Sequence, residues 1–156
     1  MENNKVYTVK EATERIQSYC AIQDRCQWDV ERKMKEWGIS DEIIENIVTD
    51  LILEKFVDEQ RFSESFCRGK FRIKKWGKVK IENELKIKNI SKKCINKGLL
   101  QIEKKEYIEV LKDLYLKKRD SLKDTNQFIR KGKIAKHLQQ KGFESKLIWE
   151  LINKDK

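Results

Sequence analysis

The chemistry that this sequence offers most clearly is cation-based binding, in the run from residue 65 to residue 81. Seven of these seventeen residues are basic and none is acidic: Arg68, Lys70, Arg72, Lys74, Lys75, Lys78 and Lys80. A face of this kind can bind a nucleic-acid backbone or an acidic protein groove, because neutralising the charges of a polyanion releases its counterions. The run therefore predicts a polyanion-binding face.

One helical side within this run combines charge with an aromatic ring. Arg68, Arg72 and Lys75 share a side of a helix at spacings i, i+4 and i+7. Phe71 lies nearly opposite the apolar stripe of the same helix and so falls among the cations, where a ring can stack on a base or enter a groove. Alternatively, Phe71 packs against a neighbouring unit and the cations only solvate the helix.

A second basic edge is predicted nearer the C-terminus. Lys133 and Lys136 are i, i+3 neighbours on a helix, and Arg130 precedes them by one turn. These three residues form a second candidate contact with a polyanion. Trp76 precedes a glycine inside the first basic run and is the tryptophan expected to face a partner.

The sequence carries no recognisable catalytic or metal-binding motif. It has no glycine-rich phosphate loop, no G-x-S-x-G motif and no combination of histidine, carboxylate and nucleophile. The four cysteines form no C-x-x-C pair and His137 lies far from all of them, so zinc is not expected. Reduced thiols in helix packing are the expected state of the cysteines. We therefore expect no enzyme and no cofactor.

Composition and charge distribution restrict the fold and the compartment. Charged residues make up 40% of the 156 residues, and proline is missing, which favours helices. No stretch is long and apolar enough for a membrane span or a signal peptide, so a cytoplasmic location is expected. The net charge of +10 is uneven, with −4 in residues 1–57, +8 in residues 58–100 and +6 in residues 101–156. This polarity favours a polyanionic partner over a merely solubilising surface.

The elements that must position these residues come from a threefold internal repeat. Each copy has a helical apolar pattern, then Gly38, Asn89 or Gly142, then an apolar residue and a second helical pattern. Glycine and asparagine are the residues that end helices in a left-handed conformation. A further apolar helical stretch precedes each copy. The sequence predicts an all-α protein of three tandem three-helix, helix-turn-helix-like repeats in an elongated, curved body. The predicted units are residues 1–57, 58–100 and 101–156.

Three residues at the start of the second unit are interpreted as mainly structural. Asp58 directly precedes a helix, where it is a good N-cap and its charge suits the helix dipole. Arg61 lies in the first turn of that helix and can pair with an acid of the first unit. Phe62 belongs to the apolar stripe.

The same segment, Phe56 to Phe66, resembles the hallmark of the RecX family, whose members regulate the bacterial RecA recombinase. It reads FVDEQRFSESF, against a Leu/Asp-Asp-x-Arg-Phe-Ala-like stretch in the family. The resemblance covers about residues 15–153, with Cys26 at a usual Ser-type cap and Lys78 where a proline often follows the glycine. It implies an all-helical repeat protein, without catalysis, that binds along the RecA–DNA filament and restrains recombination and co-protease activity.

The leading hypothesis is therefore a monomeric, non-catalytic regulator whose partners are the RecA filament and single- or double-stranded DNA. The first alternative is a stand-alone DNA-binding protein of helix-turn-helix type. Such proteins usually bind as symmetric dimers, and no dimerisation helix is evident here. The second alternative is a helical-repeat adaptor that binds no nucleic acid. Composition alone leaves the first two nearly equal, and the resemblance favours the regulator.

Overall fold

The protein is a linear stack of short helices. The computed structural model describes residues 6–155, in which nine helices and no strand occur. The helices are α1 (Val9–Ile22), α2 (Gln27–Glu36), α3 (Asp41–Leu53), α4 (Glu59–Arg72), α5 (Lys78–Ile87), α6 (Lys92–Leu99), α7 (Lys104–Ser121), α8 (Gln127–Gln140) and α9 (Ser145–Lys154). Residues 1–5 and 156, which the predicted first and third units include, lie outside the described residues.

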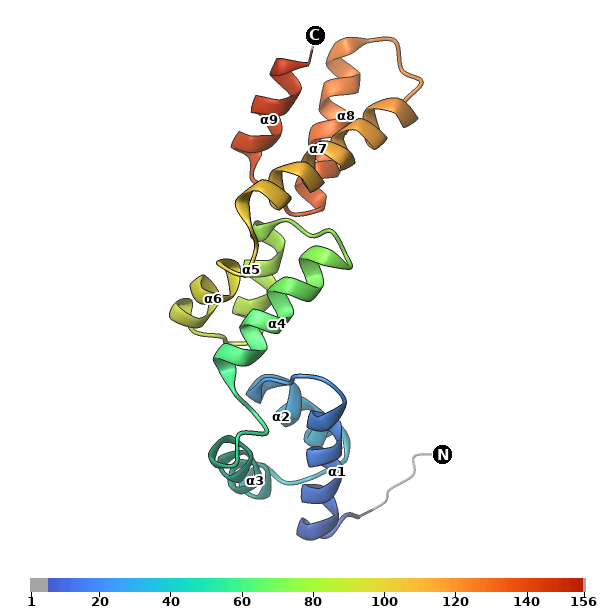
Figure 1. The fold of residues 1–156 in the computed structure, drawn as a ribbon. Coiled ribbons are helices and arrows are strands. Elements are labelled where there is room, and N and C mark those ends of the chain that lie inside the picture. Colours follow the sequence, from blue (N-terminus) through green and yellow to red (C-terminus); the bar gives the residue numbers. More distant parts are fainter. Residues whose placement is uncertain (1–5, 156) are drawn as a thin grey trace.

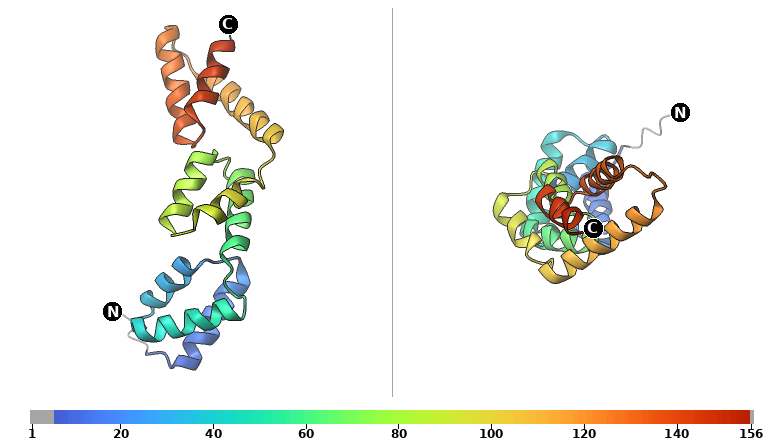
Figure 2. Two further views of the ribbon diagram at one scale, coloured as in Figure 1. Left: turned by 90° about the vertical axis from the view of Figure 1, so that its left-hand side faces the viewer. Right: turned by 90° about the horizontal axis from the view of Figure 1, so that it is seen from above.

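The helices form three groups of three that follow one another along a single long axis (Figure 1). We call α1–α3, α4–α6 and α7–α9 the first, second and third unit. The stack is also elongated when seen from the side, and in the view along its axis the three groups lie one behind another (Figure 2). The predicted all-α, repeat-built and elongated fold is therefore confirmed.

Each unit contains the same turn between its second and third helix. Gly38, Asn89 and Gly142 have φ values of 76°, 59° and 96°, as the repeat predicted. Each left-handed residue is followed by one whose N–H donates to the carbonyl five residues earlier: Ile39 to Met34, Ile90 to Leu85 and Phe143 to Leu138. This is the Schellman closure, which satisfies the last carbonyl groups of the preceding helix.

The hydrophobic core is divided into two clusters rather than three. The first unit has its own cluster, in which Ile16, Val30, Met34 and Leu51 are buried. The second and third units share the other cluster, with the buried Cys26 of the first unit at its edge. The second and third units are therefore joined by apolar packing, whereas the buried apolar residues of the first unit, apart from Cys26, pack within that unit.

The junction between the second and third units is made by direct backbone contact. The N–H of Gly77 donates to the carbonyl of Lys141 at 2.8 Å, and the N–H of Val79 donates to the carbonyl of Gly142 at 2.9 Å. A Cβ atom on Gly77 would overlap the backbone of Gly142. Glycine at both positions allows this close approach. The turn that ends α4 is thus bonded to the turn between α8 and α9.

Polar side chains join the first unit to the second. Arg61 on α4 forms an ion pair with Asp24 at 2.9 Å and also donates to the carbonyls of Lys55 and Phe56. Its own N–H donates to the Asp58 carboxylate at 2.8 Å, so Asp58 is the N-cap of α4. The predicted structural roles of Asp58 and Arg61 are therefore observed.

A second polar contact lies across the same junction. Lys88 Nζ is 2.5 Å from Asp29 Oδ1 and 4.6 Å from the centre of the Trp28 ring. The Lys88 and Asp29 side chains are largely buried, with exposed fractions of 18% and 11%. A pair in this setting is costly to break on one side, because the remaining charge stays buried without a partner.

Candidate binding surface on the second unit

The predicted cations gather around the C-terminal end of α4 and the start of α5. The helix ends at Arg72, and Lys75 follows in the turn with a left-handed φ of 58°. The N–H of Trp76 then donates to the carbonyl of Lys70 at 3.1 Å, which closes the turn. Lys75 therefore does not continue the helical side of Arg68 and Arg72. The predicted i, i+7 alignment is wrong because the helix stops one turn early.

The position of Phe71 also differs from the prediction that its ring lies among the exposed cations. Its side chain is only 1% exposed and lies in the core shared by the second and third units. Its ring is 5.7 Å from that of Tyr107 on α7, which is 5.2 Å from that of Phe143. The alternative interpretation, packing against a neighbouring unit, is the one observed. Phe71 positions the cations but cannot touch a partner.

Trp76 takes part in an aromatic–cation cluster on this surface. Lys70 Nζ is 5.0 Å from the centre of the Trp76 ring and 5.4 Å from that of Phe66, and Lys80 Nζ is 4.5 Å from the Trp76 ring. Such contacts favour the ammonium groups over the ring faces. Trp76 is half-buried, packs against the shared core, and holds two of the cations.

Most cations of this surface have no carboxylate partner. Within residues 6–155, no ion pair occurs at five of them, namely Lys70, Lys74, Lys75, Lys78 and Lys80. Arg72 approaches Glu106 only at 4.0 Å, and Arg68 donates to the amide oxygen of Gln101 at 3.2 Å. We call Lys70, Arg72, Lys74, Lys75, Lys78 and Lys80 the basic surface. Its uncompensated charge can bind an anionic partner without first breaking strong internal pairs.

Packing of the third unit adds a cation that sequence reasoning missed. Lys141 lies in the turn after α8, and its Nζ donates to the carbonyl of Lys74 at 3.1 Å. No sequence signal pointed to Lys141, because its place depends on the junction of Gly77 with Gly142. Lys74 was visible in the acid-free run, although the helical wheel did not single it out.

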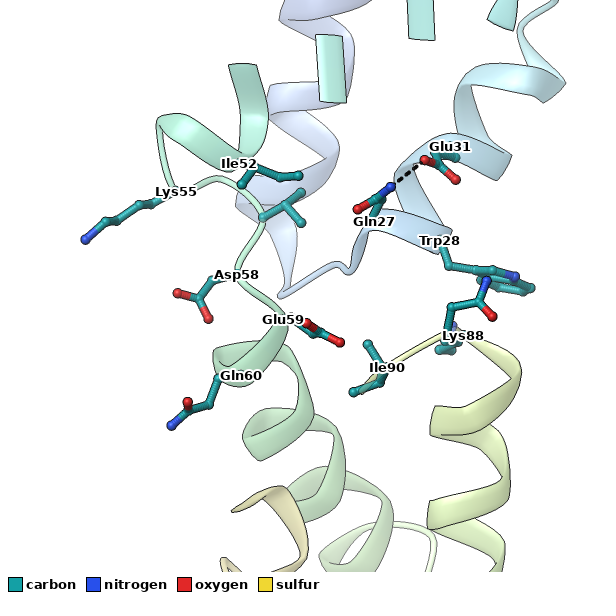
Figure 3. A pocket seen from close by; sticks show the side chains of 12 residues that line it. Gln27, Trp28, Glu31, Ile52, Lys55, Asp58, Glu59, Gln60, Lys88 and Ile90 are labelled. Atoms are coloured by element: carbon teal, nitrogen blue, oxygen red, sulfur yellow. Dashed lines mark hydrogen bonds between the residues drawn. The ribbon is translucent and has the colours of Figure 1, made fainter. Parts of the chain in front are cut away.

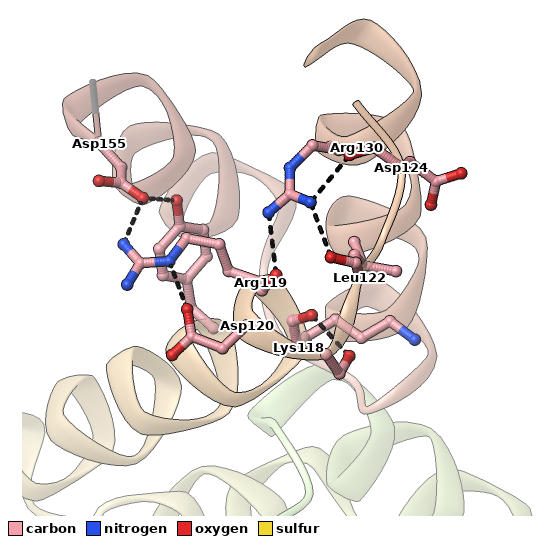
Figure 4. Close-up of polar contacts among 9 residues, drawn as sticks. Lys118, Arg119, Asp120, Leu122, Asp124, Arg130 and Asp155 are labelled. Atoms are coloured by element: carbon pink, nitrogen blue, oxygen red, sulfur yellow. Dashed lines mark hydrogen bonds and ion pairs between the residues drawn. The ribbon is translucent and has the colours of Figure 1, made fainter. Parts of the chain in front are cut away.

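The second predicted basic edge, on α8, is largely engaged in internal contacts. Arg130 donates to the carbonyls of Leu122, Asp124 and Arg119 at 2.9–3.0 Å (Figure 4). Lys133 pairs with Asp124 at 2.9 Å and, chiefly by that hydrogen bond, lowers the pKa of this carboxyl. Arg130 and Lys133 therefore fix the loop between α7 and α8, whereas their contact with a polyanion stays a prediction. Lys136 is exposed and has no ion pair among the described residues.

Replacing Arg130 with methionine is expected to lower the free energy of unfolding by about 1–3 kcal/mol, because three carbonyls lose a charged donor. Lys136→Met, on the same helix, is the matched control and is expected to change it by less than about 0.5 kcal/mol. Urea unfolding followed by circular dichroism measures both. Equal effects of the two substitutions would contradict the loop-fixing role of Arg130.

A cavity of about 600 Å³ lies where the first unit meets the second (Figure 3). Most of its polar side chains already have structural partners. Glu31 accepts from Gln27 at 2.8 Å, and Glu59 accepts from the N–H of Ser91 at 2.6 Å. Asp58 caps α4 and Lys88 pairs with Asp29. These side chains form no set of nucleophile, base and acid.

Residues capable of redox or metal chemistry are dispersed. Residues 6–155 contain no cluster of three or more His, Cys, Asp or Glu side chains that could hold a metal ion. Burial raises the pKa of the Cys26 thiol to about 12 and that of the Cys67 thiol to about 11. Both are therefore protonated at neutral pH and poorly nucleophilic. Burial, with Lys118 and Lys141 nearby, lowers the pKa of His137.

In the described part of the chain, no helix is long and apolar enough to cross a membrane.

Comparison with known proteins gives a consistent result. The family model "RecX, second three-helix domain" matches residues 58–99, and "RecX, third three-helix domain" matches residues 105–152. A "Regulatory protein RecX" of Prosthecochloris aestuarii is 29% identical over 146 residues, which cover 92% of this chain and 93% of that protein. One of Clostridium acetobutylicum is 28% identical over 155 residues, covering 97% and 70%.

Solved structures show the same similarity in three dimensions. A crystal structure of regulatory protein RecX has a TM-score of 0.83 and 26% identity, covering 94% of this chain and 73% of that chain. The crystal structure of RecX from Lactobacillus salivarius has a TM-score of 0.78 and 22% identity, covering 94% and 95%. The arrangement of the three units is therefore similar to that in solved proteins.

Proposed function

Because this chain belongs to the RecX family of regulatory proteins, we propose that it is a non-catalytic regulator of the RecA recombinase. In this proposal the protein binds the RecA–DNA filament and restrains or modulates strand exchange, ATP hydrolysis and co-protease activity during DNA repair and the SOS response. It acts as a monomer in the cytoplasm, and DNA is contacted directly or through the filament.

The observation that carries the proposal is the basic surface on an elongated body. Five of its six cations have no carboxylate partner among the described residues, so their charge is available to an anionic partner. A filament presents phosphates and protein side by side along a continuous groove. A rod-like stack of helices can lie along such a groove over its whole length, which multiplies weak contacts without a deep pocket.

A stand-alone DNA-binding protein is the second candidate. The turn at Asn89 joins α5 to α6 as in a helix-turn-helix, and Lys92 and Lys93 are exposed in the first turn of α6. The first turn of the second helix is where such proteins contact bases in the major groove. This candidate requires strong binding to naked duplex DNA in the absence of recombinase.

Titrating the protein into strand-exchange and ATPase reactions of the cognate recombinase tests the proposal. Strand exchange and DNA-dependent ATP hydrolysis are expected to change at ratios well below one protein per recombinase monomer, because one bound molecule affects a whole filament. Affinity for naked DNA is expected to be weaker than affinity for the filament. Tight binding to naked duplex with no effect on either reaction would instead favour the stand-alone DNA-binding protein.

A further inference from the structure

The side of α4 that faces the first unit forms a shallow groove of about 210 Å³. We call it the α4 groove. Its walls include Gln23 from the loop between α1 and α2 and, from α4 and the two residues after it, Phe66, Gly69, Lys70, Ile73 and Lys74. Small-molecule sites usually enclose roughly 300–1,000 Å³, so this groove suits side chains of a larger partner better than a free ligand.

The groove has an exposed apolar side chain for which the fold gives no reason. Ile73, directly after α4, is 78% exposed. Gly69 lies one turn earlier, and a Cβ atom there would meet nothing within 4 Å. A glycine inside a helix lowers helix stability relative to alanine, and no neighbour in this chain requires it. The apolar surface and the missing side chain together leave room for a partner to approach the helix closely.

The charge of the groove is positive at one end and neutralised at the other. Lys70 and Lys74 have no ion pair among the described residues. At the other end, Asp24 is paired with Arg61 at 2.9 Å. A partner that fits the groove therefore carries acidic groups near Lys70 and Lys74 and an apolar group against Ile73.

The aromatic rings beside the groove are poorly placed for base stacking. Lys70 lies over the Phe66 ring, and both Lys70 and Lys80 lie over the Trp76 ring. Phe71 is buried in the shared core. Binding of single-stranded nucleic acid uses open aromatic faces on which bases stack. The observations therefore favour a protein occupant over a nucleic acid.

We propose that the α4 groove binds an acidic protein segment of the filament that carries a large apolar side chain, with this side chain against Ile73 and Gly69 and its carboxylates at Lys70 and Lys74. This inference rests on the proposed function and names the partner of the same surface. In this proposal, the remaining cations of the basic surface contact DNA directly.

Gly69→Leu tests the proposal, because it fills the groove without changing a charge and replaces glycine with a better helix former. Gly132→Leu is the matched control, since Gly132 also lies inside a helix, α8, with open space around it. Each variant and the wild type are titrated onto recombinase–single-stranded DNA filaments and onto the same naked DNA, with helicity checked by circular dichroism.

Gly69→Leu is expected to weaken filament binding roughly tenfold or more while leaving naked-DNA binding and helicity unchanged. Ile73→Ser, at an exposed position, is expected to weaken filament binding in the same way. Gly132→Leu is expected to bind like the wild type. If Gly69→Leu and Ile73→Ser both bind the filament as tightly as the wild type, the α4 groove is not the binding site, and the proposed function still stands. A parallel loss of naked-DNA binding would show that nucleic acid fills the groove. Failure of the wild type to bind the filament would overturn the proposed function itself.

Discussion

Replacing Gly142 with alanine is expected to lower the free energy of unfolding by about 2–5 kcal/mol. Two costs add at this position. Its φ of 96° is unfavourable for any residue with a Cβ atom, at about 1–2 kcal/mol. The new Cβ would also overlap Lys80 at the junction of the second and third units, and such overpacking costs about 1–3 kcal/mol.

Gly38 offers a matched control within the same repeat. It has a φ of 76°, but a Cβ atom there would meet nothing within 4 Å. Gly38→Ala should therefore cost only the conformational part, about 1–2 kcal/mol. Urea unfolding of the two variants measures both values. Equal losses at the two positions would mean that the contact between Gly142 and Lys80 is not tight in solution.

Reversing three exposed cations of the basic surface is expected to have the largest effect on binding. In Arg72→Glu/Lys74→Glu/Lys75→Glu, filament affinity should fall at least about a hundredfold, if each lost contact is worth about 1 kcal/mol or more. The three positions are exposed, so the fold should be retained. The wild type should also bind more weakly as salt rises, because binding releases counterions. Fluorescence anisotropy on labelled filaments at two salt concentrations measures both effects.

The control must change the net charge equally at another place. Lys104, Lys105 and Lys112 are exposed on α7, and their triple replacement by Glu gives the same change in charge. This control should keep most of its affinity if the basic surface is the contact. If both triple variants bind equally poorly, only the overall charge of the protein matters. If neither binds less tightly, the contact lies elsewhere, and Lys136 on α8 becomes the first candidate.

The repeat made the fold largely predictable. Gly38, Asn89 and Gly142 mark the turns because a left-handed helix end restricts the residue type locally, whatever surrounds it. Asp58 was equally predictable, since an N-cap involves only the first turn of its own helix. The boundaries after residues 57 and 100 stay predictions, and the shared core shows that the second and third units are not independent.

The candidate surface was less predictable because it depends on contacts between units. A helical wheel assigns Phe71 to the outside of α4, but its ring packs against that of Tyr107 on α7. The wheel also assumes that the helix continues, whereas α4 ends at Arg72 and Lys75 has a left-handed backbone conformation in the turn that follows. The sequence does not show that the chain before α8 places three carbonyl groups within hydrogen-bonding distance of Arg130. None of these contacts has a signal in the local sequence.

The division of the core has a consequence for the order in which the chain folds during synthesis. The first unit can bury Ile16, Val30 and Leu51 once the chain up to Val57 has left the ribosome, since its cluster contains no later residue. The second unit cannot do the same, because Phe71 packs against Tyr107 of the third unit, and Tyr107 in turn packs against Phe143. For the time needed to add those residues, the nascent chain carries a folded first unit and an aromatic side chain that still lacks its cover.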